Sequence, residues 1–303
     1  MKKLLLQLDS SAHPSSFDQV VAYDGGAERI LSYSNVKEGD VRDLVHGAIF
    51  TRGPKDLHNT AIFLGGTDMA AGETLLAAAK KTVFGPMRVS MMLDSNGSNT
   101  TAVAAVAKLR QAAGEVAGKK AVITAGTGPV GMRAAGLLAR AGAKVVITSR
   151  KAMDAAALDA LKQRFILQHA EDASGDQSKG QGDITQVTMT DASQAASVLD
   201  GAQILLNCGP AGVMLVPKAA WAGRAGLVAA ADLNAVPPLG IEGIDVMDNG
   251  VDREGVIAFG ALGVGGLKMK IHKTCIAKLF ERNDLVLDAE TIADVARELT
   301  TTR

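Results

Sequence analysis

Short apolar runs alternate with longer alanine-rich stretches along almost the whole sequence. The apolar runs are rich in branched residues and have the length of buried strands, whereas the longer stretches carry alanine and leucine at helical spacing. This alternation is typical of parallel strands that are joined by crossover helices. The pattern therefore predicts an α/β fold.

The first part of the chain is expected to form one α/β domain. Its strands are predicted at residues 3–8, 48–51, 61–64 and 88–92, and its helices at residues 16–23 and 68–81. A helix over residues 98–117 is predicted to link this domain to the next one.

From residue 120 the strand and helix units repeat, which predicts a doubly wound sheet. Its strands are expected at residues 121–125, 144–148, 184–189, 204–207, 227–231 and 256–259, and its helices at residues 130–141, 152–165 and 192–199. The polar segment 170–182 interrupts the pattern, and we interpret it as a mobile surface insertion that carries no site.

The C-terminal part is expected to return to the first domain. A glycine run ends at residue 266, and helices follow near residues 267–281 and 289–299. If these helices pack on the first domain, they close a cleft between two lobes. The predicted segments are residues 1–98 for the N-terminal α/β domain, 99–266 for the doubly wound domain and 267–303 for the returning helices.

The composition agrees with a folded α/β protein and excludes other classes. Of the 303 residues, 47% are hydrophobic and 21% are charged, which excludes a globally disordered chain. The 33 glycines and only 3% aromatic residues favour helix–sheet layers over an all-β sandwich. The 32 basic and 32 acidic side chains balance, so no nucleic acid is expected as a partner.

The cysteines and the N-terminus bear on the compartment. Cys208 and Cys275 lie far apart and in no CxxC spacing, so neither a disulfide framework nor a structural zinc site is indicated. The apolar segment within residues 1–8 is too short for a signal peptide or a membrane span. The sequence therefore predicts a cytoplasmic protein with no membrane partner and no metal.

The sharpest motif is a GxGxxG string directly between a predicted strand and a predicted helix. Gly126 permits a tight turn, Gly128 lets the backbone approach a pyrophosphate, and Gly131 allows the helix to contact the strand. The helix would offer free N–H groups to the anion. We therefore expect a dinucleotide to bind the whole motif, which consists of Gly126, Thr127, Gly128, Pro129, Val130 and Gly131.

The end of the next strand favours NADP over NAD. An NAD enzyme places an acidic residue there to bind the ribose 2′-hydroxyl, whereas this sequence has Ser149, Arg150 and Lys151. A guanidinium, an ammonium and a hydroxyl suit a 2′-phosphate. The alternative is that the two cations are solvated residues of a helix's first turn, where positive charge is mildly unfavourable. NADP is the predicted cofactor, and NAD is a weaker alternative.

Two later strand ends are expected at the same edge of the sheet, where ribose and nicotinamide lie in such folds. These segments span residues 207–212 and 232–236, and their candidate cofactor-binding residues are Cys208, Gly209, Pro210, Ala211 and Asn234. A nucleophilic role for Cys208 would need a histidine partner, and the sequence assigns none. A packed or cofactor-lining thiol is the favoured interpretation.

Six strings in the sequence carry a resemblance to a known family. They are YDGGA at 23–27, FLGG at 63–66, LDSNGSNTTA at 93–102, AGTGPVGMR at 125–133, PPLGIEGID at 237–245 and FGALGVGGLK at 259–268. Together they resemble the methylene-tetrahydromethanopterin dehydrogenases of methylotrophic bacteria in their NADP-dependent form. The resemblance runs nearly from end to end, although segment 170–182 is longer than the family leads us to expect.

The resemblance implies a two-lobed enzyme that binds a one-carbon pterin in the cleft, opposite the nicotinamide. The implied reaction is reversible hydride transfer from the methylene carbon to NADP+, which leaves a methenyl cation. Tetrahydrofolate forms are possible further substrates, and a homo-oligomer such as a trimer is implied. No proton moves in this step, which agrees with the lack of an acid–base constellation among the histidines His13, His46, His58, His169 and His272.

The candidate substrate site contains two carboxylates. Asp24, with Gly25 and Gly26, and Asp94 each follow an apolar segment and would favour positive charge or hold pterin amino groups. The alternative for Asp94 is a helix cap.

Four further residues complete this site. Ser98, Asn99 and Thr100 are expected to act as caps, as cleft-lining donors or as both. Lys268 matches the family's cleft lysine and is expected to orient the substrate, with a solvated lysine at a helix start as the alternative. We assign Lys268 and Asp94 to catalysis and the remaining residues to substrate binding.

Two other functions stay open at this point. A folate dehydrogenase with cyclohydrolase activity uses a tyrosine and a lysine one helical turn apart, and Tyr33 and Lys37 have that spacing. However, their segment is a poor helix, because it contains Ser34, Asn35 and Gly39. A non-catalytic NADP-binding redox sensor is the other alternative, although such a sensor would not need the polar residues of the first domain.

Overall fold

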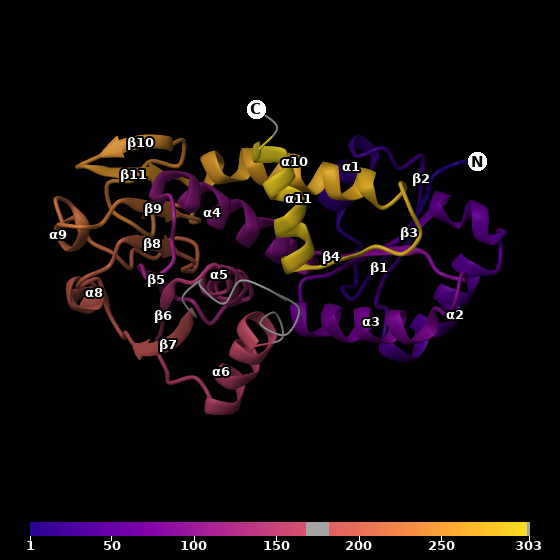
Figure 1. Ribbon diagram of the computed structural model, residues 1–303, viewed down its shortest axis with the longest axis horizontal. Helices are drawn as coiled ribbons and strands as arrows, with labels where there is room; N and C mark the ends of the chain where they lie inside the picture. The colour runs from indigo at the N-terminus through magenta and orange to yellow at the C-terminus, as the bar shows by residue number, and fades with distance from the viewer. Residues whose placement is uncertain (168–181, 302–303) are drawn as a thin grey trace. The chain divides into compact units, whose positions relative to one another are not determined.

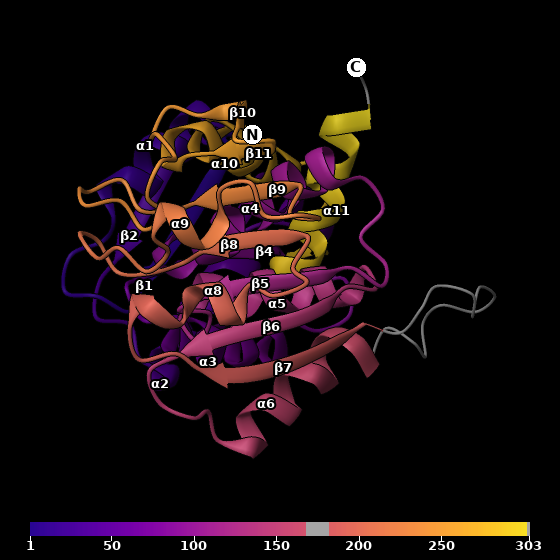
Figure 2. The same ribbon diagram turned by 90° about the vertical axis from the view of Figure 1, so that its left-hand side faces the viewer.

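The computed structural model describes residues 1–167 and 182–301, which belong to two compact units (Figures 1 and 2). The first unit comprises Met1–Thr100 and Lys268–Arg303, and the second comprises Thr101–Leu267. Each unit has its own sheet. This arrangement confirms the predicted α/β class, with a C-terminal segment that returns to the first unit.

The described part of the first unit contains a five-stranded parallel sheet in the order β12-β4-β3-β1-β2. The strands are β1 (Leu4–Asp9), β2 (Arg29–Tyr33), β3 (Thr60–Gly65), β4 (Ser90–Leu93) and β12 (Val286–Leu287). The longer helices are α1 (Ser16–Asp24), α2 (Glu38–Ile49), α3 (Met69–Thr82) and α11 (Ala289–Thr301), and short 3-10 turns lie at η1 (Pro54–Asn59) and η2 (Ser95–Gly97). Apolar residues of β1, β3 and β4 pack with α2 and α3 into one core.

The described part of the second unit contains a seven-stranded sheet in the order β10-β11-β9-β8-β5-β6-β7. Its strands are β5 (Lys120–Thr124), β6 (Lys144–Ser149), β7 (Asp183–Thr188), β8 (Ile204–Asn207), β9 (Ala229–Asp232), β10 (Asn249–Arg253) and β11 (Val256–Phe259). The chain runs outward from β5 to β7 and then returns to β8 on the other side of β5. The topological switch point therefore lies between β5 and β8, where such sheets bind ligands.

The helices of this part are shorter on average than predicted. They are α4 (Ser98–Ala113), α5 (Pro129–Arg140), α6 (Ala155–Lys162), η3 (Gln163–Leu167), η4 (Ala192–Gln194), α8 (Ala195–Val198), α9 (Lys218–Trp221) and α10 (Ala261–Lys278). By the division into units, α4 begins in the first unit and α10 ends in it. No helix among the described residues is long and apolar enough to cross a membrane.

Two element predictions were wrong, and several elements were missed. Residues 48–51 are not a strand, because Ala48 and Ile49 form the buried end of α2. The strand β2 and the antiparallel strand β10 were missed, since most of their residues are exposed and give no apolar run. The glycine run before residue 266 is helical. The predicted insertion 170–182 lies almost entirely outside the described residues.

Close packing explains the glycines at the start of α10. A Cβ on Gly260 would lie 2.0 Å from the backbone oxygen of Asp245, and a Cβ on Gly263 would lie 2.0 Å from that of Asp248. Backbone atoms cannot yield as a flexible side chain can, so a larger residue would push the helix away from this segment. Gly260 and Gly263 therefore serve helix packing, whereas a Cβ on Gly265 or Gly266 would meet no atom within 4 Å.

Candidate cofactor and substrate sites

The glycine motif forms the turn between β5 and α5. A Cβ on Gly126 would lie 2.9 Å from the Cβ of Ile147, so the turn packs directly on β6. A Cβ on Gly131 would lie 2.6 Å from the Cα of Gly126, which places the first turn of α5 in backbone contact with the loop. Only glycine permits both approaches.

Hydrogen bonds to β6 hold this turn in an unusual backbone conformation. Ala125 has a φ of 51°, in the left-handed region that a residue with a side chain seldom adopts. Its N–H donates to Thr148 Oγ1 over 3.2 Å, and the Gly126 N–H donates to the Thr148 backbone oxygen over 2.9 Å. Strain of this kind clusters at ligand-binding sites, where the surroundings fix it.

Space for a ligand remains beside Gly128, which precedes α5 as its N-cap. A Cβ there would have only the Ala125 oxygen within 4 Å, at 3.9 Å. Pro129 begins the helix, and no described side chain caps the Gly128 end. Thr127 is exposed, and Val130 is half-buried. The open glycine and the uncapped N–H groups fit a pyrophosphate.

The loop after β6 holds two unpaired cations. Arg150 and Lys151 are exposed, and neither forms an ion pair with a described residue. The Ser149 hydroxyl donates to the Lys151 backbone oxygen and accepts from Gln186 Nε2 at 2.8 Å, which fixes the loop against β7. Because α6 begins only at Ala155, the cations are not residues of a helix's first turn, although they are solvent-exposed as that alternative expected. The pair fits a 2′-phosphate.

A buried polar network occupies the switch point between β5 and β8. The Thr124 hydroxyl donates to Asn207 Oδ1 over 2.7 Å, and Asn207 Nδ2 donates to Asp232 Oδ1 over 2.7 Å. Gly240 packs against this network, since a Cβ there would lie 1.8 Å from Asn207 Nδ2. The network joins the carboxyl ends of β5, β8 and β9 into one rigid edge.

The loops after β8 and β9 carry the other predicted cofactor residues. Pro210 and Ala211 are exposed and free to line a ligand, whereas Gly209 lies against Leu215. The Asn234 amide is turned inward, because Nδ2 donates to the backbone oxygens of Pro210 and Pro238. Asn234 therefore shapes this loop pair with its side chain.

Cys208 follows β8, and its thiol is expected to be unreactive. Burial, and to a smaller extent the nearby Asp232 carboxylate, raise the pKa of this thiol to about 12. The thiolate is the nucleophilic form, so Cys208 stays protonated at neutral pH. This agrees with the favoured interpretation of a lining thiol.

In the first unit, Asp94 binds the start of α4. Its Oδ1 accepts from the N–H groups of Asn99 at 2.9 Å and Thr100 at 3.0 Å, and its Oδ2 accepts from the Thr100 hydroxyl at 2.5 Å. The Asn99 amide donates to the Leu93 backbone oxygen over 2.6 Å. All three side chains are fully buried. The geometry is that of the capping alternative, with a carboxylate at a helix N-terminus.

Asp18, which the sequence analysis missed, lies near this cap. Its carboxyl group is buried in the first turn of α1, and desolvation raises its pKa from 3.8 to about 6. The Asp94 charge raises this pKa further, whereas Ser15 and Lys268 lower it. In the sequence, Ser15 and Asp18 have the spacing of a helix cap, which concealed any other role.

Lys268 lies in the middle of α10 and not at a helix start, so the proposed alternative for it was wrong. Its Nζ lies 4.4 Å from the ring centroid of Phe17, within cation–π range. The Phe17 side chain is 49% exposed. Lys268 and Phe17 thus form a partly solvent-exposed cation–π pair beside the buried Asp18 carboxyl group.

The structure separates Asp24 from Asp94. Asp24 is the last residue of α1 and not part of a loop, and its Oδ2 lies 2.7 Å from Lys273 Nζ. A Cβ on Gly25 would lie 2.7 Å from the Ile276 Cβ, and Gly26 is left-handed at φ 101°. These residues end α1 beside the amino ends of the strands, whereas Asp94 follows the carboxyl end of β4.

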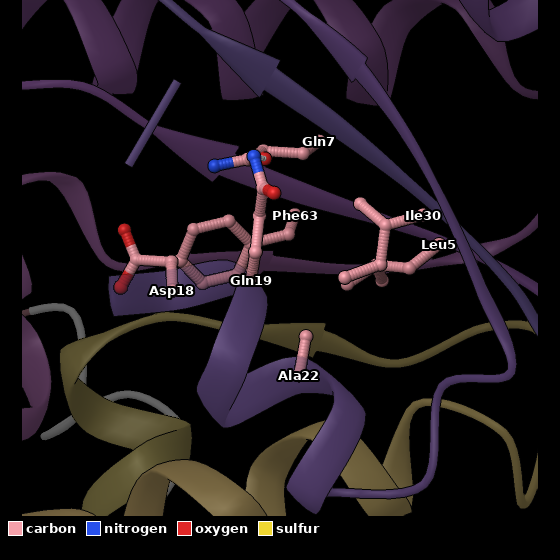
Figure 3. A pocket seen from close by; sticks show the side chains of 7 residues that line it. All are labelled: Leu5, Gln7, Asp18, Gln19, Ala22, Ile30 and Phe63. Carbon is pink, nitrogen blue, oxygen red and sulfur yellow. Dashed lines mark hydrogen bonds between the residues drawn. The ribbon is translucent and has the colours of Figure 1, made fainter. Parts of the chain in front are cut away.

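The recess between α1 and the sheet is not a ligand pocket. Figure 3 shows its lining, which includes Gln7, Gln19, Asp18 and Phe63. The recess has no room even for a water molecule, whereas a ligand site is a cleft or cavity that buries most of its ligand. Gln19 Nε2 donates to Gln7 Oε1 over 3.0 Å, so the polar groups satisfy one another.

Known proteins similar to this chain place it in a family. Residues 16–96 match the family described as "Methylene-tetrahydromethanopterin dehydrogenase, N-terminal". The chain is 51% identical over 300 residues to the "Bifunctional protein MdtA" of Methylorubrum extorquens, with 98% of this chain and 99% of that protein covered. It is 32% identical over 313 residues to the "NAD(P)-dependent methylenetetrahydromethanopterin dehydrogenase" of the same organism, with the same coverage. The chain belongs to the methylene-tetrahydromethanopterin dehydrogenase family.

Membership in this dehydrogenase family confirms the predicted resemblance and the prediction that the protein is an oxidoreductase. Among solved structures, the shikimate 5-dehydrogenase of Listeria monocytogenes in complex with shikimate and NAD is similar in fold, with a TM-score of 0.53. The two chains are 14% identical, and 99% of this chain and 96% of that one are covered. This likeness bears on the fold alone and agrees with the α/β class.

For this member of the dehydrogenase family, we expect Asp18→Asn to raise stability. Folding raises the pKa of Asp18, so the protonated carboxyl group favours the folded state. This contribution to the unfolding free energy is complete below about pH 3.8 and is lost as the pH rises through about 6. The neutral amide avoids burying a charge, and the full pKa change corresponds to about 3 kcal/mol.

Urea unfolding at pH 8 and pH 5 tests this expectation. The gain in unfolding free energy should be large at pH 8 and smaller at pH 5. A variant that is less stable than the wild type at pH 8 would show that the carboxylate makes a favourable contact in the folded protein.

Proposed function

We propose that the protein catalyses reversible hydride transfer from methylene-tetrahydromethanopterin to NADP+, giving the methenyl pterin in one-carbon metabolism. Family membership and the name of the 32% identical relative support the pterin as substrate. The unpaired Arg150 and Lys151, one strand from an open glycine turn, support NADP as the preferred cofactor and carry this part of the proposal.

The residues divide into two groups by ligand. NADP+, when bound, accepts the hydride at its nicotinamide ring. The turn from Gly126 to Gly131 would hold the pyrophosphate, and Arg150 and Lys151 would hold the 2′-phosphate, while the loop at 208–211 would line the ribose and nicotinamide. Lys268 and Asp18 would orient the pterin, with Asp94 and the start of α4 behind them.

Electrostatics explain how this set favours the reaction without proton transfer. Removal of a hydride leaves positive charge on the pterin, and carboxylates held nearby stabilise that charge more than the neutral reactant. Asp94 is fixed by three hydrogen bonds, so it would need no reorganisation. Lys268 lies over Phe17 and would direct its charge to a pterin carbonyl.

The folate dehydrogenase–cyclohydrolase alternative loses its main support. Tyr33 ends β2 and Lys37 is the N-cap of α2, so the two side chains do not share a helical turn. Methylene-tetrahydrofolate nevertheless remains the second candidate substrate that the sequence resemblance suggests. A homo-oligomeric state and a cytoplasmic location remain predictions from the sequence.

A direct assay tests the proposal. The purified protein is mixed with methylene-tetrahydromethanopterin and NADP+, and the absorbance of the reduced nicotinamide is followed. We expect turnover with this pair, with a higher KM when NAD+ replaces NADP+. A parallel reaction with methylene-tetrahydrofolate tests the second substrate. Absence of signal with both pterin and folate, while NADP+ binds, would favour the sensor.

A further inference from the structure

His272 is a buried polar residue that no hydrogen bond explains. It lies on α10, its side chain is 0% exposed, and neither ring nitrogen has a hydrogen-bond partner among the described residues. Leaving two polar atoms unpaired in a protein interior is costly, and native structures seldom tolerate it without a reason. The position therefore calls for an explanation other than packing.

One aromatic ring and two charged groups act on the imidazole of His272. Its ring stacks on Phe63 of β3, with 5.6 Å between centroids and 18° between planes. The charged groups that act on it are Asp94, before α4, and Lys268, on its own helix. Burial lowers the pKa of His272 more than the Asp94 charge raises it. The ring is therefore neutral, and one nitrogen carries a proton.

One contact is nearly formed. The Nδ1 atom of His272 lies 3.8 Å from Asp94 Oδ2, about 1 Å beyond a normal hydrogen bond. The same oxygen already accepts from the Thr100 hydroxyl, and a carboxylate oxygen has room for a second donor. Catalytic hydrogen bonds are often long in a ligand-free protein and shorten when the ligand binds.

His272 follows Lys268 by four residues, which is about one turn of α10. A movement of α10 that brings the imidazole to Asp94 would therefore carry the lysine with it. The hydroxyl of Ser98, fully buried in the first turn of α4, also lacks a partner among the described residues. The unpaired atoms thus lie on both helices that would have to adjust.

We propose that His272 is a positioning residue for hydride transfer: its Nδ1–H closes onto Asp94 when the pterin binds, and this contact sets the turn of α10 that carries Lys268. The inference rests on the proposed function. The proposal explains why this buried position holds an imidazole, although a phenyl ring would pack as well. The hydrogen bond to Asp94 would stabilise the protein when the pterin is bound.

Three variants separate this role from packing. His272→Phe keeps a flat ring on Phe63 and removes both nitrogens, so it should unfold at the same temperature as the wild type or a higher one. Its kcat with the pterin should fall about tenfold or more, as expected for a lost orienting contact. The KM for NADP+ should not change, because the proposed cofactor residues lie in the second unit.

The amide variants identify the nitrogen. The amide of His272→Asn lies at the height of Nδ1 and should restore most of the lost turnover, whereas that of His272→Gln reaches the position of Nε2 and should not. A wild-type kcat in His272→Phe would overturn the inference and leave the proposed function intact. A loss of turnover that is matched by a large fall in the unfolding temperature and is rescued by neither amide would also overturn it, in favour of packing.

Nitrogen NMR of the imidazole gives a readout that does not depend on turnover. Methylene-tetrahydromethanopterin alone is added to the wild-type protein and, as an assignment control, to His272→Phe. We expect the Nδ1 resonance of His272 to move as the pterin binds. Binding without any change at His272 would overturn the inference. A wild-type protein that binds the pterin but fails to oxidise it would instead overturn the proposed function, and the inference with it.

Discussion

Replacing Gly128 with valine should abolish NADP+ binding while the protein stays folded. The space around a Cβ at this position is empty apart from one backbone oxygen at 3.9 Å, and the backbone φ of −74° suits any residue. A branched side chain would fill the place where the pyrophosphate approaches the backbone. Losing two charge-assisted hydrogen bonds of about 1.5–3 kcal/mol each lowers affinity about 100-fold or more.

Gly131→Ala supplies the matched control for this variant. Its Cβ would lie 2.6 Å from the Gly126 Cα, so α5 must move away from the turn and the unfolding temperature should fall. Calorimetric titration with NADP+ and thermal unfolding of both variants separate the two effects. If Gly128→Val binds NADP+ as the wild type does, the turn is structural and the cofactor lies elsewhere.

Local patterns explain how much of the fold could be predicted. The strands β3, β5 and β8 are buried along almost their whole length, so they form apolar runs that the sequence displays directly. The edge strand β2 has mostly exposed residues and therefore no such run. The residues 48–51 look like a short strand, because a few apolar positions cannot distinguish a strand from the buried end of a helix.

The prediction for the start of α10 was wrong for a different reason. Four glycines between Gly260 and Gly266 indicate a loop by propensity alone. The helix closely approaches the backbone of Asp245 and Asp248, and this packing outweighs the low helix propensity of glycine. Contacts between residues that are distant in the sequence leave no local signal in it. The helix therefore begins six residues earlier than predicted.

The two candidate sites also differ in how far local sequence patterns reveal them. Most of the cofactor site is local, because one turn and the end of the next strand contain nine of its fourteen predicted residues. The pterin candidates depend on the sheet, which brings Asp18 of α1, Asp94 after β4 and His272 of α10 into one neighbourhood. Asp24 follows an apolar run as Asp94 does, but it ends the helix α1 and does not lie in a loop as predicted.

The second large effect is expected from Arg150→Glu, which should convert a preference for NADP+ into a preference for NAD+. Arg150 is exposed, forms no ion pair with a described residue and precedes α6 by several residues, so its replacement should not alter the fold. Losing one charge-assisted contact to the 2′-phosphate costs about 1.5–3 kcal/mol, or about 10- to 150-fold in the KM for NADP+. The introduced carboxylate also repels the phosphate and can accept from a ribose hydroxyl.

Lys144→Glu is the matched control, because Lys144 is an exposed cation at the opposite end of the same strand. It makes the same change in net charge, so it reports any long-range electrostatic effect on NADP+. KM values for NADP+ and NAD+ are measured for both variants at low and moderate salt. We expect Lys144→Glu to leave both values close to those of the wild type. Equal losses for NADP+ and NAD+ in Arg150→Glu would show that the guanidinium does not meet the 2′-phosphate, and the assignment of NADP as the preferred cofactor would then lose its basis.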